Sequence, residues 1–346
     1  GIADISDAVV VPPVEARFKQ RTGVLTAEGA YVPLAETRRH GATLTLAPPM
    51  PDELRARLSG TWLWGGTLYD HFGHFLIESQ ARLWQIHACG IPCQGIVFVP
   101  KRPRRTGGAR HFQADVLAAW GIDAEVQLAT RPTSVERLIV TPQGIGLGAR
   151  IAGTPEMRRT AWDHFGIGIA PDGPDRLYVS RSRLAPEHGA ILLEPEIEAA
   201  LAVDGYTAFH PQDHDIPTQI ARYKAARQII ICDGSPAHLF AYLARPSQQV
   251  GYLPRRRIWH DGPVDHIAAF ARRRPRLLPM PAREWLPRVP KTFRNVFYSM
   301  HDMAELGAAL AAAEMIETLS AWADPDPERV ERRIAEIVPA AHFAEA

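Results

Sequence analysis

Apolar and polar positions along the chain follow two periods, and the two kinds of segment alternate. Short apolar runs bounded by glycine, proline or charged residues predict strands, and segments with a period of about 3.6 residues predict helices. The predicted strands are Val9–Val11, Gly23–Thr26, Ala42–Leu46, Gly95–Pro100, Glu125–Leu128, Val135–Thr141, Arg176–Ser180, Tyr206–Phe209, Gln228–Cys232 and Gln249–Leu253. The predicted helices are His111–Trp120, Pro155–Phe165, Glu194–Val203, Pro217–Ala226 and Pro236–Ala244. This alternation is typical of an α/β fold with a parallel sheet.

The stretch Leu63–Ile86 carries the most unusual pattern of the chain. It begins as a strand that ends in a glycine turn, and it continues as an amphipathic helix. At about 100° per residue, one face of this helix carries Phe72, Phe75, Leu76, Ser79, Leu83 and Ile86. The opposite face carries Asp70, His71, His74, Glu78, Ala81 and Gln85. A face that is only solvated usually carries Lys, Arg and Glu, so His, Asp and Glu beside a glycine turn indicate a cleft.

The polar face of this helix is open to three interpretations. Glu78 follows His74 by one helical turn, the spacing at which side chains on a helix meet, which suits a catalytic base and its partner. Ordinary half-buried histidines beside a solvated glutamate would give the same pattern. A metal site is the third interpretation, because His-x-x-His with an acid one turn on can supply ligands. No second, well-spaced set of ligands elsewhere in the sequence supports it.

The length of the chain and a Gly- and Pro-rich stretch near its middle predict two α/β domains and a tail. A chain of 346 residues is too long for one small core, and the stretch 166–174 is its richest linker in Gly and Pro. We expect an N-terminal domain at 1–170 and a second domain at 171–280. The tail at 281–346 is predicted to be helical, with helices at Met303–Leu319 and Pro327–Ile337. It would pack back on the body or form a homo-oligomer contact.

Composition and charge narrow the class of protein. A net charge of +1 with 46% hydrophobic residues predicts a globular, soluble chain without a strongly charged partner. The three cysteines form no disulfide framework, and no apolar run is long enough to span a membrane. The first residues lack the features of a signal peptide, so a cytoplasmic location is expected. The basic runs at 255–257 and 272–276 come without a nucleic-acid motif, so we interpret them as solvated surface and expect no nucleic-acid partner.

A basic, glycine-containing segment follows the predicted strand Gly95–Pro100. Its sequence, KRPRRTGGAR, covers Lys101–Arg110. Such a segment suits either a solvated loop or a surface that meets an anionic acceptor or membrane headgroups. Peripheral membrane contact therefore stays open as an alternative.

Polar residues in the second half gather where two predicted parallel strands end. Ser180, Arg181 and Arg183 follow one strand, and Asp233, Gly234 and Ser235 follow another. Loops at the carboxyl ends of parallel strands are where α/β folds bind ligands. Ser235 fits the cap of the next helix, whose free N–H groups suit a phosphate, and the arginines suit a diphosphate. The alternative is a plain helix cap beside two surface arginines.

Three sequence blocks together resemble the bacterial branch of glycosyltransferase family 61, the capsular polysaccharide biosynthesis type. The first block is Tyr69–Ser79 with Arg82-Leu83, which is similar to a His-Phe-Leu-Leu-Glu block followed by Arg-Leu. The second is Leu177–Arg181 with Arg183, Glu194 and Glu196, and it resembles a Tyr/Ile-x-Ser-Arg block followed by Asn-Glu. The third runs from Gln219-Ile220 through Ile229–Cys232 to Gly234-Ser235. Two positions depart from the family pattern: Leu193 replaces Asn and Asp233 replaces His. These departures are expected to affect donor recognition.

The resemblance implies a fold and an activity. The fold would be GT-B, with two facing Rossmann-like domains, and the reaction an inverting, metal-independent transfer from a nucleotide sugar without a further cofactor. The acceptor would be a surface glycan or a lipid-linked glycan. We expect His74 to be the base with Glu78 as its partner, and Asp70 and His71 as alternates. The expected donor-binding residues are Ser180, Arg181, Arg183, Glu194, Asp233, Gly234 and Ser235. Two other functions stay open: a metal-dependent hydrolase that uses Asp70, His71, His74 and Glu78, and a non-catalytic subunit that binds nucleotide sugars.

Overall fold

Two larger sheets, one in each half of the chain, organise the structure. The computed structural model describes residues 1–88, 90–103, 111–258, 261–289 and 296–346. The chain divides into unit 1, Gly1–Gly168, and unit 2, Ile169–Ala346. The boundary falls within the Gly- and Pro-rich stretch 166–174. Among the described residues, no helix has the length and apolarity needed to cross a lipid bilayer.

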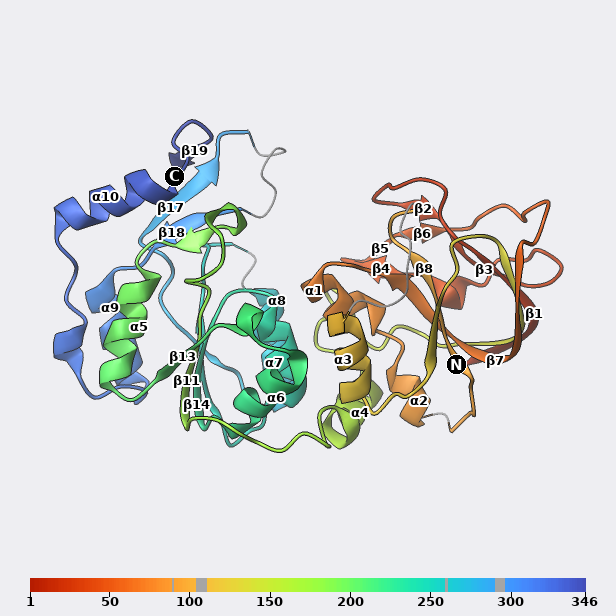
Figure 1. The fold of residues 1–346 in the computed structure, drawn as a ribbon, viewed down its shortest axis with the longest axis horizontal. Helices are drawn as coiled ribbons and strands as arrows, with labels where there is room; N and C mark the ends of the chain where they lie inside the picture. The colour runs from red at the N-terminus through yellow and green to blue at the C-terminus, as the bar shows by residue number, and fades with distance from the viewer. Residues whose placement is uncertain (89, 104–110, 259–260, 290–295) are drawn as a thin grey trace. The chain divides into compact units, whose positions relative to one another are not determined.

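Unit 1 is built on a six-stranded sheet (Figure 1). In spatial order its strands are β3 (Gly23–Leu25), β1 (Ala3–Val11), β10 (Thr133–Val140), β7 (Ala56–Leu68), β8 (Gly95–Pro100) and β9 (Glu125–Leu128). The strands from β10 to β9 run parallel, whereas β1 is antiparallel to both of its neighbours. Every residue of β8 is buried, which confirms the prediction of a buried strand in a parallel sheet.

The remaining elements of unit 1 are short. Its two longer helices are α3 (His111–Ala119) and α4 (Pro155–His164), both close to their predicted bounds. Four two-residue strands form two small ladders: β2 (Gln20–Arg21) with β6 (Thr45–Leu46), and β4 (Arg38–Arg39) with β5 (Ala42–Thr43). Of the basic segment 101–110, residues 104–110 lie outside the described residues, so the prediction for that loop stays a prediction.

The segment after β7 differs from the regular amphipathic helix that its periodicity predicts. It forms a short helical turn, α1 (Phe72–His74), then a π-helical turn at Phe75–Ser79 and, after residues 80–83, helix α2 (Trp84–Ala88). Residues 75–83 are all buried, so the prediction of one buried and one open face is wrong.

Buried polar side chains explain why this segment can be enclosed on all sides. The Ser79 hydroxyl donates to the carbonyl of Thr67 and accepts from the N–H of Tyr69, at 2.9 Å each. The Gln80 amide donates to the carbonyl of Leu76 at 2.6 Å and accepts from the indole N–H of Trp120 at 2.5 Å. Because their hydrogen bonds are satisfied inside the protein, these polar positions do not need water.

Unit 2 is built on a five-stranded, fully parallel sheet. In spatial order its strands are β13 (Thr207–Phe209), β11 (Arg176–Val179), β14 (Gln228–Cys232), β15 (Gln249–Leu253) and β16 (Arg276–Leu277). Helices α5 (Glu194–Val203) and α9 (Met303–Ala312) cover one face (Figure 1). Helices α6 (Ile216–Ala225), α7 (Pro236–Leu243) and α8 (Asp261–Ala271) cover the other. The prediction of an α/β fold with a parallel sheet is confirmed here.

The strand order of unit 2 creates a switch point. Numbered along the chain, its strands have the order 2-1-3-4-5, so the connections leave β11 and β14 in opposite directions. In doubly wound sheets of this order, ligands bind outside the carboxyl ends of the strands at that point. The residues that follow β11 and β14 are those that the sequence singles out, from Ser180 and from Asp233 onward.

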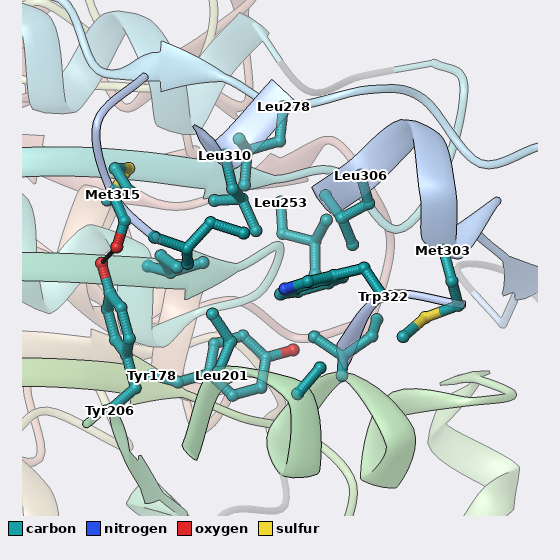
Figure 2. Close-up of a cluster of buried hydrophobic side chains, with 14 of the residues drawn as sticks. Tyr178, Leu201, Tyr206, Leu253, Leu278, Met303, Leu306, Leu310, Met315 and Trp322 are labelled. Atoms are coloured by element: carbon teal, nitrogen blue, oxygen red, sulfur yellow. Dashed lines mark hydrogen bonds between the residues drawn. The ribbon is translucent and has the colours of Figure 1, made fainter. Parts of the chain in front are cut away.

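A buried cluster fixes α9 and the following turn against the sheet of unit 2 (Figure 2). Trp322 lies fully buried in this cluster, and the Tyr206 hydroxyl donates to the carbonyl of Met315 at 2.9 Å. The labelled side chains are Tyr178, Leu201, Tyr206, Leu253, Leu278, Met303, Leu306, Leu310, Met315 and Trp322. These residues come from strands, from α5, from α9 and from the loops beside them, so the cluster joins the sheet to the C-terminal part of the chain.

The C-terminal segment contains strands as well as helices. Helix α10 (Pro327–Ile337) has its predicted bounds, but the predicted helix Met303–Leu319 ends at Ala312, beyond which Glu314 adopts a positive φ of 56°. Three strands were not predicted: β17 (Arg283–Pro287), β18 (Tyr298–Met300) and β19 (Phe343–Glu345). With β12 (Ala190–Ile191) they form a four-stranded sheet. Most of these strands are too short to show an alternating pattern in the sequence.

The contact between Gly307 and Trp322 yields a prediction about stability. A Cβ at Gly307 would lie 2.5 Å from both Cβ and Cγ of Trp322, atoms that cannot move without moving the indole ring. Alanine in an open helix is favoured over glycine by about 1 kcal/mol. We nevertheless expect Gly307→Ala to lower the free energy of unfolding by about 2 kcal/mol, because overpacking outweighs helix propensity here.

Urea denaturation measures this effect, and Gly262→Ala in α8 is the matched control. A Cβ at Gly262 would meet no atom within 4 Å. That variant should unfold at or slightly above the wild-type urea midpoint. A Gly307→Ala protein as stable as wild type would contradict the packing argument.

Candidate functional site

In unit 1, the side chains of His74 and Glu78 form a hydrogen-bonded pair. Nδ1 of His74 lies 2.8 Å from Oε2 of Glu78. The Glu78 side chain has no exposed surface, whereas the His74 side chain is 34% exposed. Because the carboxylate is an acceptor, the bond places the imidazole proton on Nδ1 and leaves the lone pair on Nε2. The buried partner therefore orients a partly exposed imidazole whose second nitrogen can accept a proton.

Arg39 completes this site from a distant part of the sequence. Its Nε and Nη2 donate to the two carboxylate oxygens of Glu78, at 2.8 Å and 2.6 Å. Nη2 also lies 3.4 Å from Nδ1 of His74 and 3.5 Å from the Tyr69 hydroxyl. Such a bidentate pair is the strongest geometry available to a carboxylate and a guanidinium. We call Arg39, His74 and Glu78 the unit 1 triad.

A second arginine holds the loop that leads into β4, the strand that carries Arg39. Arg82 is buried, and its Nη2 donates to the carbonyls of Leu34 and Glu36, at 3.1 Å and 2.6 Å. Burial and the nearby Arg150 lower the pKa of Arg82 to about 9. The N–H of Arg38 donates to the Gln143 side chain at 2.7 Å. These contacts fix the backbone just before Arg39, so the guanidinium reaches Glu78 from a defined position.

The charge state of Glu78 results from opposing effects. Burial by itself raises the pKa of this carboxyl group. The hydrogen bonds from His74 and Arg39, together with the charge of Arg39, outweigh burial, so the pKa of Glu78 lies below its usual value. Glu78 is therefore a carboxylate at neutral pH.

The two alternate candidates for the base, His71 and Asp70, both lie outside the triad. His71 is exposed, its ring centroid lies 5.1 Å from that of His74, and its Nδ1 accepts the His74 N–H at 3.4 Å. Asp70 is half-buried at the end of β7 and does not belong to the triad. Within the described ranges, no group of three or more His, Cys, Asp or Glu side chains is arranged to hold a metal ion. The predicted hydrolase cluster of four residues is therefore not assembled as a ligand set.

In unit 2, the carboxyl ends of β14 and β15 bring a buried carboxylate and two arginines together. Asp233 is 1% exposed and accepts from the Tyr252 hydroxyl at 2.7 Å. Nε of Arg256 lies 2.9 Å from its Oδ2. Burial raises the pKa of Asp233, but the charges of Arg256 and Arg255 outweigh it and the net pKa is lowered. Asp233 is thus an ionised anchor for arginines.

Two further guanidinium groups at these strand ends have unused donors. Arg255 is 5% exposed, and burial and Arg181 lower its pKa to about 10. In the described part of the chain, Nε of Arg255 and Nε of Arg181 are buried and have no hydrogen-bond partner. An unpaired buried donor is costly, so such donors mark a place that suits an added anion. We call Arg181, Asp233, Arg255 and Arg256 the unit 2 arginine cluster.

Two glycines allow these arginines to approach the backbone. A Cβ at Gly189 would lie 2.6 Å from Nη1 of Arg255, and the residue has a positive φ of 74°. A Cβ at Gly234 would lie 2.9 Å from Nη1 of Arg181. Nη2 of Arg181 donates to the carbonyl of His188 at 3.2 Å. The loop before β12 and the loop after β14 therefore both lie against the guanidinium of Arg181.

A buried acid, Glu194, and a half-buried one, Glu198, organise the loop that carries Arg181. One oxygen of Glu194 accepts from the Tyr178 hydroxyl at 2.9 Å, from the Ser180 hydroxyl at 3.1 Å and from the Arg181 N–H at 2.8 Å. Burial raises the pKa of Glu194 more than these bonds lower it. Glu198, which sequence reasoning missed, has its Oε1 2.5 Å from Oγ of Ser180 and 3.2 Å from Nε2 of His210. Glu194 and Ser180 thus position Arg181.

Two predicted donor-binding residues do not join this cluster. Arg183 is exposed, and its contact in the structure is an ion pair with Asp213 at 3.3 Å. Ser235 precedes α7, but it has a helical backbone and makes no side-chain cap, so the predicted cap is wrong. A capping side chain needs an extended backbone at that residue.

A hollow in unit 2 lies away from this chemistry. Its volume is about 610 Å³, and its lining includes Gln249, Arg276 and Glu314. Gln249 and Arg276 begin β15 and β16, so the hollow is at the amino ends of the strands. Ligands of doubly wound sheets bind at the carboxyl ends. We therefore assign ligand binding to the arginine cluster.

Arg39 and Arg255 are the main residues that sequence reasoning missed. Arg39 lies 39 positions before Glu78, in a region without a helix or strand pattern that would point to it. Arg255 belongs to the run 255–257 that was interpreted as solvated surface, which is wrong for this residue. Its position two residues after the predicted strand Gln249–Leu253 was the available signal.

Comparison with known families identifies the family to which the chain belongs. The model of the family described as Glycosyltransferase 61 matches residues 72–250. A search of curated proteins gave no match. The matched range includes His74, Glu78, Arg181 and Asp233 but not Arg39, which the structure alone adds to the site.

The unit 1 triad yields a prediction about stability and its pH dependence. Glu78→Gln removes the countercharge of Arg39, and we expect it to lower the free energy of unfolding by about 3 kcal/mol at pH 7. Because the pKa of Glu78 is lowered in the folded state, its stabilisation is present above the unfolded value of 4.5 and is lost as pH falls below it. The difference between wild type and variant should therefore narrow in acid.

Chemical denaturation at pH 7 and at pH 4 tests this. Glu336→Gln is the matched control, because Glu336 pairs with Arg333 on the surface and is 63% exposed. That change should alter stability by less than about 0.5 kcal/mol. Equal stability losses in both variants would contradict the role given to Glu78.

Proposed function

Because the chain belongs to glycosyltransferase family 61, we propose that it is an inverting, metal-independent transferase that moves a sugar from a nucleotide sugar to a glycan. A surface or capsular polysaccharide, or a lipid-linked glycan, is the proposed acceptor. The observation that carries the proposal is the imidazole of His74, held at Nδ1 by the buried carboxylate of Glu78.

His74 is the proposed general base. Its Nε2 takes the proton of the acceptor hydroxyl while that oxygen attacks the anomeric carbon, and the bond from that carbon to the diphosphate breaks. Glu78 and Arg39 keep the imidazole in the required tautomer, and the carboxylate stabilises the imidazolium that forms. Attack from the face opposite the leaving group inverts the configuration at the anomeric carbon.

The unit 2 arginine cluster is the proposed site of the donor diphosphate. Arg181 and Arg255 offer buried N–H groups at the switch point of the sheet. Positive charge and N–H donors aimed at the departing diphosphate stabilise the charge that develops on it. Asp233 keeps Arg256 in place, and Gly234 lets Arg181 reach the strand end.

Metal independence and the GT-B organisation are parts of this proposal. Three guanidinium groups gather around one ionised aspartate, so the protein itself supplies cations that a diphosphate needs. Unit 2 is assigned to the donor and unit 1 to the acceptor, as in the two-domain GT-B enzymes that the sequence blocks resemble. Arg183 and Ser235 are assigned no direct contact with the diphosphate.

Ligand binding tests the donor site. Thermal-shift measurements with uridine, guanosine, cytidine and thymidine nucleotides and their sugars, with and without EDTA, should give a chelator-insensitive shift for one nucleotide class. A ligand at one hundred times its Kd stabilises the native state by about 2.7 kcal/mol. Arg255→Gln should weaken binding at least about tenfold, because a charged hydrogen bond is lost, while Arg257→Gln on the same loop should not. A shift that disappears with EDTA would contradict metal independence, and no shift at all would contradict the donor site.

Kinetics test the base. His74→Ala should lower kcat by roughly 10² to 10⁴ and leave the melting temperature within a few degrees of wild type. His71→Ala distinguishes the two neighbouring imidazoles. A fully active His74→Ala enzyme, or a larger loss in His71→Ala, would overturn the assignment to His74.

A further inference from the structure

An exposed aromatic ring stands next to the unit 1 triad. The ring centroid of Phe18 lies 5.7 Å from Cζ of Arg39, and the ring centroid of Tyr69 lies at the same distance from that atom. Tyr69 is buried, whereas Phe18 is 61% exposed. The guanidinium that binds Glu78 is thus in contact range of two rings, one of which faces solvent.

The loop that carries Phe18 is held by hydrogen bonds from the side chains of Lys101 and Gln20. Nζ of Lys101 donates to the carbonyls of Arg17 and Phe18, at 2.8 Å and 3.1 Å, and to Oε1 of Gln20 at 3.0 Å. The Gln20 amide donates to the carbonyl of Glu15 at 2.6 Å and to that of Lys101 at 3.0 Å. Gln20 is buried, and burial together with Arg39 lowers the pKa of Lys101.

These bonds fix an apolar side chain where the hydrophobic effect would not place it. An exposed phenylalanine contributes little to folding, and most of its apolar surface stays in water. Here the backbone on either side of the ring is nevertheless tied to the end of β8 through Lys101. A ring that is held in place, exposed and adjacent to the guanidinium that binds Glu78 suits contact with a substrate.

We propose that Phe18 is the stacking platform for a sugar ring of the acceptor, and that Lys101 positions it. The inference rests on the proposed function and deepens it, because it assigns a ring-shaped, hydroxyl-bearing acceptor to this side of the triad. A pyranose has one face on which C–H bonds cluster, and that face packs on the π-surface of an aromatic ring. Stacking there brings a hydroxyl of the same sugar toward the imidazole of His74, which lies on the other side of the Arg39 contact.

Polar groups on the same loop complete the recognition of a sugar. Glu15 and Arg17 form an exposed ion pair within three residues of Phe18. Their carboxylate and guanidinium groups can bind hydroxyl groups at the edge of a stacked sugar. An aromatic face with polar groups around it is the usual composition of a small-molecule site.

Two reactions of the same enzyme separate acceptor binding from donor chemistry. Nucleotide release with water as acceptor reports on the donor site, and release stimulated by p-nitrophenyl glycosides of common hexoses and pentoses reports on the acceptor. Phe18→Ala should raise the KM for the best glycoside on the order of tenfold, the loss expected for one aromatic contact, and change hydrolysis by water far less than it changes transfer to the glycoside. Phe18→Trp should keep the wild-type KM.

Lys101→Met and Val14→Ala complete the series. Lys101→Met keeps the ring but frees its loop, so the KM for the glycoside should rise as in Phe18→Ala while kcat changes little. Val14 is 85% exposed on the segment that precedes Phe18, and its truncation should leave both reactions unchanged. Equal KM values in wild type and Phe18→Ala, or a higher KM for the nucleotide sugar in Phe18→Ala, would overturn the proposal.

A binding measurement keeps this test independent of turnover. In Phe18→Trp, methyl glycosides should change the fluorescence of the introduced indole, and Lys101→Met in the same background should weaken that response. If the wild-type protein released no nucleotide from any donor, the proposed function would be contradicted. The fluorescence change in Phe18→Trp would still show whether a sugar binds at position 18. Turnover without any fluorescence change would contradict sugar stacking at position 18 but not the proposed transferase activity.

Discussion

The bidentate pair between Arg39 and Glu78 is the interaction on which the unit 1 site depends. A carboxylate without exposed surface is stable only if its charge is matched and its oxygens are bonded. The two donors of Arg39 and Nδ1 of His74 meet that requirement together. The same bonds determine the tautomer and direction of the imidazole. One buried charge thus connects folding to the chemistry proposed for His74.

Unit 2 uses the same physical principle in a different arrangement. Asp233 is the buried, ionised carboxylate there, and it pairs with Arg256 beside Arg255 and Arg181. Glu194 organises the neighbouring loop through a serine, a tyrosine and a backbone N–H. In both units a buried acid sets the direction of charged donors before any substrate arrives. Such preorganisation removes the reorganisation cost that flexible surface arginines would carry.

The regular features of the fold could be predicted from the sequence because their signals are local. Helix α5, helix α10 and strands β8, β14 and β15 have the predicted bounds. The segment after β7 was mispredicted because internal hydrogen bonds of Ser79 and Gln80 remove the need for a polar face. The short C-terminal strands were missed because two or three paired residues show no period.

The sequence by itself determined the alternation of strands and helices, the pairing of His74 with Glu78 at one helical turn, and the placement of Arg181 and Asp233 at strand ends. These follow from periodicity and from adjacency along the chain. Only the tertiary structure decided that Arg39 neutralises Glu78, that Arg255 is buried beside Asp233, and that Phe18 is held next to the triad. These contacts join residues far apart in the sequence, and their geometry depends on how loops are anchored. No local pattern encodes it.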